Sequence, residues 1–485
     1  MRRRAGLAAA FALLAAPAAA QDLTLTGVMI GADHQTYREV PFRVPAGVTA
    51  VTVEFAYTGR EQKSVIELGL RDPQRFRGWS GGNKARFTVS ETWATPSYLP
   101  GPLPAGTWRL ILGVPNLRKD ARAEYTAKVT FERNGRFQGF AEAPLTTGPA
   151  WYRGDLHLHT AHSDGSCAAQ SGKRAPCPLY RTLEAAAARG LDFVAVTEHN
   201  TSSHHQALAE LQPAFDRLLL IPGREITTFQ GHANVFGTTA PLDFQLGGPR
   251  APTLGRILDQ AEAAGALVSI NHPGLPSGEA CMGCGWTAPT GDRRIAAVEA
   301  INGGNAVGLA FWEARLNEGR RVTAIGGSDN HDATLDPARA PAVGVPTTVV
   351  HAENLSQAAI LDALRAGHAF VDLAGSRDRL LDVTARAGSA SARMGDVLRI
   401  PAGERVSVEV RLKGVETGRL AYAGPLAARI REAGVGPLSA DETRTLTLVG
   451  EQPLSGWLRI DVRGPDGRLW LLGNPIYLEP ATSRP

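Results

Sequence analysis

The chain has 485 residues, which is too long for one ordinary domain. Its 51 basic and 47 acidic residues leave a formal net charge of +4 at pH 7. Three of the basic residues are Arg2, Arg3 and Arg4, and without them the net charge falls to +1. A charge balance this close to neutral excludes the electrostatic argument for a nucleic-acid partner.

The first residues have the order of a secretory signal peptide. Arg2, Arg3 and Arg4 precede an apolar run of roughly 16 residues, which ends at Ala18-Ala19-Ala20. A membrane anchor is the alternative, but the run is shorter than the ~20 residues needed to span a bilayer. We expect cleavage after Ala20, and no later segment is apolar enough to cross a membrane. The sequence therefore predicts a periplasmic or secreted protein with no membrane span.

After the signal peptide, short alternating runs separated by Pro and Gly turns predict a β-sandwich at residues 21–149. The clearest runs lie at 48–55, 107–112 and 125–131. This region also contains Trp79, Trp93 and Trp108. Such aromatic residues could form a carbohydrate platform, but packing in the sandwich core is their more frequent role.

The central part contains nine of the twelve histidines, all between His157 and His331. In Asp155-Leu156-His157-Leu158-His159 the two imidazoles point to the same side of a strand. Comparable groups recur at 197–199, 231–232, 271–273 and 327–331. One buried histidine alone is usually a hydrogen-bonded core residue, but the joint pattern indicates a multinuclear metal site.

Most of these candidate ligands follow an apolar, β-branched run. The runs are 191–196, 218–221, 266–270 and 322–325, and predicted helices lie between them at 182–189, 205–218, 253–264 and 309–318. Gly190, Gly265 and Gly319 close three of these helices. The repeat of strand, ligand loop and helix predicts a parallel barrel with its chemistry at the carboxyl ends of the strands.

The candidate ligands form an ordered set that resembles the PHP (polymerase and histidinol phosphatase) superfamily. The set is His157-x-His159, Asp164, Glu198-His199, Glu225, His232, His272 and Asp329-x-His331. The similarity covers residues 152–372, and the flanking regions resemble the secreted carbaryl-hydrolase-like branch. The resemblance implies an α/β fold, a distorted (β/α)7 TIM-like barrel at residues 150–375, with hydrolytic, usually phosphoester, chemistry. The substrate does not follow, because one fold hosts many reactions.

The resemblance also implies two to three divalent ions (Mn, Zn or Fe). The first would be held by His157, His159, Glu225 and Asp329. Glu225 would bridge to a second ion held by His232 and His272. Asp164, His199 and His331 would hold a third, although some relatives have a histidine in place of Asp164. Glu225, Asp329 and His331 are the expected catalytic residues, and a hydroxide shared by two ions is the expected nucleophile.

Several nearby residues have no implied ligand role. Glu198 could orient His199 or lie at the barrel rim. We expect His162, His204 and His205 to be solvated loop residues rather than groups that contact substrate. Arg224 could bind an anionic substrate or form a salt bridge in the barrel. Gly327-Ser328-Asp329 lacks the second glycine of a serine nucleophile elbow.

The four cysteines lie in loops of the central part. In an oxidising compartment an even number favours disulfides, and we expect Cys167 to pair with Cys177 and Cys281 with Cys284. A structural zinc site made of all four is the alternative, but the Cys-x2-Cys spacing occurs once. Either disulfide would stiffen a loop that follows a proposed ligand.

A second β-rich region, with clear runs at 406–412 and 457–462, predicts a C-terminal β-sandwich at residues 376–485. The leading function is a metal-dependent hydrolase of a small-molecule ester, with phosphomonoesters or phosphodiesters preferred. Carboxyl or carbamate ester hydrolysis is the runner-up. A non-catalytic binding protein with a degenerate barrel is the third possibility, but each position of the ligand set carries a competent donor. The sequence does not predict the oligomeric state.

Overall fold

The computed structural model describes residues 22–133, 137–279, 281–432, 436–450 and 454–481. The predicted signal peptide lies outside these residues. The chain divides into two compact units, Met1–Asn134 and Gly135–Pro485. The domain boundaries expected at 149/150 and 375/376 stay predictions. No helix among the described residues is long and apolar enough to cross a membrane.

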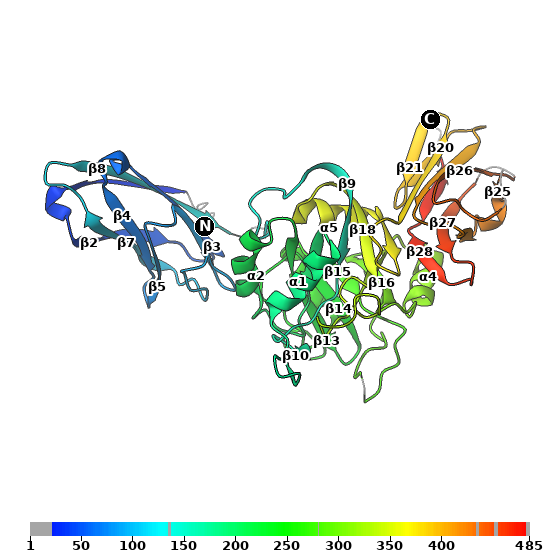
Figure 1. Cartoon of the computed structure of the whole chain (residues 1–485), viewed down its shortest axis with the longest axis horizontal. Coiled ribbons are helices and arrows are strands. Elements are labelled where there is room, and N and C mark those ends of the chain that lie inside the picture. Colours follow the sequence, from blue (N-terminus) through cyan, green and yellow to red (C-terminus); the bar gives the residue numbers. More distant parts are fainter. Residues whose placement is uncertain (1–21, 134–136, 280, 433–435, 451–453, 482–485) are drawn as a thin grey trace, which may run out of the picture. The chain divides into compact units, whose positions relative to one another are not determined.

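The N-terminal unit consists of two four-stranded antiparallel sheets (Figure 1). One sheet has the order β1 (Leu23–Ile30), β8 (Arg122–Glu132), β3 (Ala50–Tyr57) and β6 (Arg86–Ser90). The other has the order β2 (Thr36–Val44), β7 (Gly106–Asn116), β4 (Val65–Arg71) and β5 (Phe76–Gly81). Single-turn 3-10 helices occur at Gly31–Asp33 and Arg60–Gln62.

The core of this unit lies between the two sheets. In β8 alternate residues are buried, as expected for a sheet with one solvated face. Trp108 is fully buried there, whereas Trp79 and Trp93 are partly exposed. The core role proposed for these tryptophans therefore holds for Trp108.

Six strands of the second unit run in the same direction. They are β9 (Thr147–Asp155), β12 (Phe193–Val196), β13 (Leu219–Thr228), β15 (Leu267–Ile270), β16 (Ile295–Asn302) and β17 (Thr323–Gly327). An antiparallel strand, β14 (Gly231–Phe236), stands between β13 and β15. The short pair β10 (Ser166–Ala168) and β11 (Arg174–Pro176) follows β9. Four of the parallel strands, from β12 to β17, are buried along nearly their whole length.

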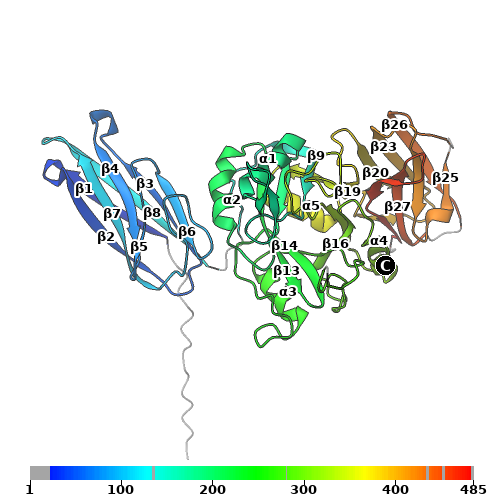
Figure 2. The same cartoon turned by 60° about the horizontal axis from the view of Figure 1, so that its bottom comes forward.

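Helices accompany these strands (Figures 1 and 2). They are α1 (Leu179–Arg189), α2 (His205–Leu211), α3 (Leu254–Ala263), α4 (Leu309–Asn317) and α5 (Gln357–Ala366), and a 3-10 turn, Gln212–Ala214, extends α2. Gly190, Gly265 and Gly319, predicted to end helices, each have positive φ. Among the described residues no helix separates β15 from β16. The mixed α/β class is confirmed, but a regular (β/α)7 barrel is not.

The ends of the first and last parallel strands meet. The amide of Asp329, just after β17, donates to the carbonyl of His157 at 2.9 Å. The amide of His159 donates to the carbonyl of Asn330, also at 2.9 Å. An isolated parallel bridge also pairs His199 with Glu225. These contacts gather the residues that follow the strands at one end of the sheet.

The central sheet continues into the C-terminal strands. β18 (Thr347–Asn354) pairs with β9 and β19 (Ala369–Asp372), and β19 pairs with β28. The strands that follow are β20 (Leu380–Ala387), β21 (Ala390–Arg393), β22 (Val397–Ile400), β23 (Val406–Lys413), β24 (Arg419–Ala423), β25 (Ile430–Glu432), β26 (Asp441–Leu448), β27 (Gly456–Arg463), β28 (Leu469–Gly473) and β29 (Ile476–Pro480). A 3-10 turn occurs at Ala427–Arg429. Residues of β20, β23 and β26 share one core with residues of β27, β28 and β29 (Figure 2).

Candidate metal centre

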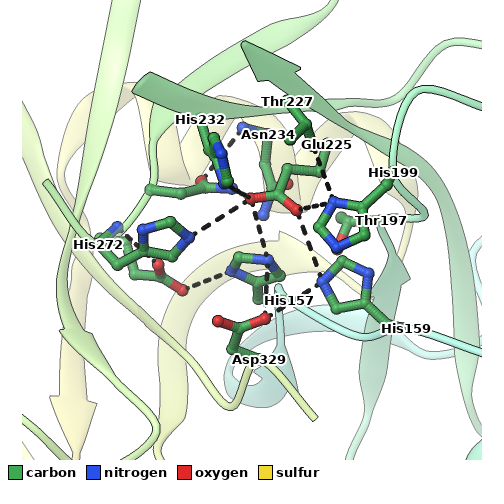
Figure 3. A network of polar contacts seen from close by, with 12 residues as sticks. His157, His159, Thr197, His199, Glu225, Thr227, His232, Asn234, His272 and Asp329 are labelled. Atoms are coloured by element: carbon green, nitrogen blue, oxygen red, sulfur yellow. Dashed lines mark hydrogen bonds and ion pairs between the residues drawn. The ribbon is translucent and has the colours of Figure 1, made fainter. Parts of the chain in front are cut away.

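Glu225, in the second half of β13, lies at the centre of the candidate site (Figure 3). Its side chain is buried, and five imidazoles from four chain segments surround its carboxylate. They belong to His157, His159, His199, His232 and His272, with nitrogen-to-oxygen distances of 3.6, 3.6, 2.7, 3.3 and 3.5 Å. The Glu225 carboxylate therefore faces residues expected to hold each of the two paired ions.

The residues expected for the first ion converge. Asp329 Oδ1 lies 3.3 Å from His157 Nε2 and 3.2 Å from His159 Nε2. The same two nitrogens face the two oxygens of Glu225. Both histidines are fully buried, so their ligand atoms face a space shielded from solvent. The ligand atoms of His157, His159 and Asp329 lie within 4.8 Å of one another.

The residues expected for the second ion lie on the other side of Glu225. His232 Nδ1 and His272 Nε2 face the same oxygen of Glu225, Oε1, at 3.3 and 3.5 Å. His157, Glu225 and His272 also form a group of ligand atoms within 4.8 Å. Because His157 faces both sides, two ions held here would share Glu225 and lie close together.

The residues expected for the third ion form a more exposed group. His331 Nε2 lies 3.2 Å from Asp164 Oδ1, and His199 Nε2 lies 3.6 Å from the same oxygen. His159 belongs to this group as well, because its ring stacks on those of His199 and His331. The Asp164 side chain is 59% exposed, whereas Glu225 is 1% exposed. This third group would therefore be the easiest for solvent and substrate to reach.

Backbone carbonyls and a carboxylate fix which ring nitrogen of each histidine faces the site. His232 Nε2 donates to the carbonyl of Met282 at 3.1 Å, which leaves Nδ1 facing Glu225. His331 Nδ1 donates to the carbonyl of Asp329 at 2.9 Å, which leaves Nε2 facing Asp164. A carbonyl can only accept, so the opposite nitrogen carries the lone pair that a cation needs.

Glu299 on β16 is a residue that sequence analysis missed. It is 1% exposed, and its Oε1 accepts from His157 Nδ1 at 2.9 Å. Its other oxygen accepts from the amide of His272 at 2.9 Å. Glu299 thus orients His157, which is expected to bind the first ion, and also holds the backbone of His272, which is expected to bind the second. The signal was a single acidic residue in the apolar run 295–301, because a buried charge needs a partner.

Asn271, from the Asn-His-Pro segment, supports the bridging carboxylate. Its side-chain amide donates to Glu225 Oε1 at 2.9 Å, while its oxygen accepts from the amide of Asn234 at 3.1 Å. The next residue, His272, has a φ of 26°, and Asp329 has a φ of 54°. Non-glycine residues rarely adopt this region, and such strained positions cluster at functional sites.

The charges of the site are strongly coupled. Burial alone would raise the pKa of Glu225, but the surrounding imidazoles, led by His157, lower this pKa well below its ordinary value. Burial lowers the pKa of His159. The hydrogen bond from His331 lowers the pKa of Asp164 to about 2. Burial opposes protonation of His331, yet its bond to Asp164 raises its pKa to about 9.

The donor set fits divalent cations. Within the described residues, His157 Nε2, both ring nitrogens of His159 and His272 Nδ1 are buried without a hydrogen-bond partner. Unsatisfied buried polar atoms are costly, and the Nε2 atoms of His157 and His159 face the Glu225 carboxylate, so these two nitrogens fit the role of cation ligands. Mixed imidazole and carboxylate ligands suit zinc, manganese or iron.

Two histidines predicted to be solvated are in fact buried. His204 and His205 have no exposed surface, and Nε2 of each lies 3.0 to 3.2 Å from the carbonyl of Gly223. Burial lowers the pKa of His204 well below its ordinary value and that of His205 to about 3. Their role is structural, at the start of α2. His162 contacts Ser203 and, as expected, belongs to no candidate ligand group of the described chain.

The structure gives Glu198 and Arg224 partners other than those expected from the sequence. Glu198 is buried and accepts hydrogen bonds from the amide and hydroxyl of Thr160 and from Ser163, so it holds the loop that carries Asp164. The salt bridge suggested for Arg224 is wrong, because no described carboxylate pairs with it. Its guanidinium instead faces the carbonyls of Ala240 and Leu242 at 3.4 Å. Burial lowers its pKa to about 10.

Both predicted cysteine pairs are confirmed at disulfide distance. Cys167 and Cys177 have Cα atoms 4.9 Å apart, and Cys281 and Cys284 have Cα atoms 5.6 Å apart. The first pair joins β10 to the residue that follows β11, and both cysteines lie in the segment after His157 and His159. Two disulfides point to an oxidising environment.

Comparison with known proteins yields structural similarity but no match in sequence. No family model and no curated protein matches the chain. The chain is similar to the crystal structure of a two-domain protein from Bacteroides vulgatus that contains a predicted PHP-like metal-dependent phosphoesterase. The two sequences are 18% identical, and the similarity covers 71% of this chain and 98% of the other, with a TM-score of 0.38. The function is therefore argued below from the site itself.

Proposed function

We propose that the chain is a metal-dependent hydrolase of the PHP type that cleaves a phosphoester or phosphodiester bond of a small molecule. The observation that carries this proposal is the ring of buried imidazoles around Glu225. Such a ring is poorly suited to a purely structural role, because several of its nitrogens have no other partner among the described residues.

The chain's own residues would do three things. His157, His159 and Asp329 would hold one ion, His232 and His272 a second, and Glu225 both. Glu299 and the carbonyl of Met282 would keep the correct ring nitrogens turned toward the ions. Asp164, His199 and His331 would hold a third ion or contact the substrate directly. When bound, the ions would lower the pKa of water toward ~7 and stabilise charge on the substrate oxygen.

The charge of the site favours an anionic substrate. Two divalent ions carry more positive charge than Glu225 and Asp329 neutralise, and the site is largely closed to water, so the excess acts at low dielectric. A phosphoester gains more from this excess than a neutral carboxyl or carbamate ester does. The (β/α)7 barrel and an exported location belong to the same proposal, supported by the parallel strand ends and the two cysteine pairs.

Metal analysis of two variants tests the site. Removing Glu225 takes a ligand from two ions, so Glu225→Ala should lose most of its bound metal, whereas His162→Ala should retain the wild-type content. The Glu225→Ala and His162→Ala variants should be loaded with metal in parallel, and the equivalents of bound ion per chain should be measured. Equal content in the two variants would contradict the bridging role.

A substrate panel tests the reaction. Metal-replete protein should hydrolyse chromogenic phosphomonoesters or phosphodiesters faster than aryl carboxyl esters, and chelation should remove the activity. In water enriched with heavy oxygen, a single turnover should place solvent oxygen in the acid product, because no covalent enzyme intermediate is expected. Preferential aryl ester cleavage would favour the carboxyl or carbamate esterase reading instead.

A further inference from the structure

The loop Cys281–Cys284 lies against the residues proposed for the second ion. Cys284 is fully buried. Its sulfur and the ligand atoms of His232 and His272 all lie within 4.8 Å of one another. The sulfur is therefore close enough to share an ion with the two imidazoles, and this observation rests on the metal site proposed above.

The backbone holds this loop in place by contacts that do not involve sulfur. The carbonyl of Met282 accepts from His232 at 3.1 Å. Gly283 has a φ of 79° and packs so tightly that a β-carbon there would collide with the carbonyl of Thr228. The amide of Gly285 also donates to Ser277 Oγ at 3.0 Å. Because these contacts fix the residues before and after Cys284, Cys284 would stay beside the two imidazoles after its disulfide is broken.

The two sulfur states differ as ligands. A disulfide sulfur is neutral and binds divalent cations poorly, whereas a thiolate is a strong ligand for zinc and cobalt. With Cys284 free, the second site would offer two imidazoles, one thiolate and the Glu225 carboxylate, all of which are donor types that zinc binds. The first site has imidazole and carboxylate donors alone, so only the second would change its metal preference.

We propose that reduction of the Cys281–Cys284 disulfide makes Cys284 a ligand of the second ion and shifts that site toward thiophilic metals. A dithiol supplies the two electrons and becomes a disulfide, while the Cys281–Cys284 bond breaks and each sulfur takes up one proton. The Cys284 thiol then releases its proton to solvent as it binds the ion. The second site thereby responds to the redox state of its compartment.

The second disulfide of the chain provides an internal control. Cys167 and Cys177 are also buried, and their Cα atoms are a similar distance apart. Among the described residues, however, neither belongs to a group of candidate metal ligands. Breaking this disulfide should leave the metal preference of the site unchanged.

Cobalt(II) is a suitable probe, because thiolate ligation produces a charge-transfer absorption band that imidazole and carboxylate ligation does not. Cys281→Ser leaves Cys284 free without any reductant, and this variant should show the band. Cys284→Ser breaks the same disulfide but removes the ligand, so it should not show it. The double variant Cys167→Ser/Cys177→Ser should lack the band as the oxidised wild type does. Treating the wild type with a phosphine reductant, which takes an oxygen from water, should produce it.

Affinity gives a second readout. Loss of even an indirect partner of a ligand costs about 10- to 100-fold in metal affinity, so a direct thiolate should tighten cobalt or zinc binding in Cys281→Ser by about 10-fold or more over Cys284→Ser. Cobalt binding without a thiolate band in Cys281→Ser would overturn this inference and leave the proposed function intact. A band in Cys284→Ser would also overturn it. Absence of cobalt binding in all variants would overturn the proposed function as well.

Discussion

The two units of the chain each bury charged side chains, but they satisfy them in opposite ways. In the N-terminal unit, Arg77 is fully buried and pairs with buried Asp72 at 2.9 Å. The same nitrogen, Nη1, also donates to the carbonyl of Pro102, while Nε and Nη2 donate to the carbonyls of Leu99 and Gly101. Asp72 in turn accepts from the amides of Gln74 and Arg75. This network is complete, so its role is to hold the loop after β6 against the sheet.

In the candidate metal centre, several buried polar atoms have no hydrogen-bond partner among the described residues. His157, His159 and His272 have ring nitrogens without partners among the described residues, although they lie around the buried carboxylate of Glu225. A complete buried network stabilises a fold, whereas an incomplete one destabilises it unless a ligand completes it. Both sites bury charged groups, so charge does not distinguish a structural ion pair from a binding site. The difference is whether the buried polar atoms have hydrogen-bond partners.

Loss of a direct ligand should have the largest effect. Asp329 lies within 3.3 Å of both His157 and His159, so Asp329→Ala should abolish turnover. His331 turns Nε2 toward the exposed Asp164, away from the first pair of ions, so His331→Ala should retain measurable activity. Steady-state rates of both metal-loaded variants check this order. Wild-type turnover by Asp329→Ala after exhaustive chelation would defeat the mechanism.

Breaking the complete network should cost stability but not metal. Arg77→Ala leaves Asp72 buried without its cation, which should lower the free energy of unfolding of the N-terminal unit by about 3–5 kcal/mol. Arg71→Ala removes a pair with Glu39 in which both side chains are 45% exposed, and it should cost at most about 1 kcal/mol.

Denaturant unfolding measures both variants, and metal content should match the wild type in each. Lost metal in Arg77→Ala would show that the two networks are not independent.

Removing an orienting partner should have an intermediate effect. Glu299→Gln keeps the size of the side chain but weakens its hold on His157, so metal affinity should fall by about 10- to 100-fold. Glu318→Gln is a suitable control, because Glu318 is exposed and pairs only with Arg315 on α4. Titration of the two variants with the same divalent ion compares their metal affinities. Equal affinities would assign Glu299 a purely structural role.

The smallest effect concerns pH and the N-terminal unit. Burial alone would raise the pKa of Asp72, but Arg77 and two backbone amides hold it below its ordinary value of 3.8. A carboxyl with a lowered pKa contributes stability that is fully present above its unfolded pKa and is lost as the pH falls through its folded pKa.

Wild type and Asp72→Asn should therefore differ in stability at neutral pH, and the difference should shrink below 3.8. Unfolding measured across the acid range tests this. A difference that grows toward low pH would contradict the direction of the shift.

Much of the candidate site could be predicted from local patterns. A histidine pair at positions i and i+2, or a ligand directly after an apolar run, is a property of a few neighbouring residues, and the structure brings these segments to one place. The pairing of Cys281 with Cys284 follows equally from their spacing. Helix ends at Gly190 and Gly319 follow from the freedom of glycine to adopt positive φ.

The errors arose where the environment comes from distant segments. His204 and His205 have the polar neighbours of a solvated loop, yet β13 covers them, and the carbonyl of Gly223 satisfies them. Arg224 was expected to find a carboxylate, but two carbonyls of the loop after β14 take that place. Side-chain identity alone does not reveal such partners, because every residue carries a carbonyl.

The sequence by itself predicted the candidate ligand set and the α/β class, because ligand type and strand periodicity are local quantities. Only the tertiary structure decided that Glu225 faces five imidazoles, that Glu299 orients His157 and that Met282 orients His232. These relations join segments up to 142 residues apart. They depend on strand order and on the direction of each ring, and a one-dimensional pattern does not contain either.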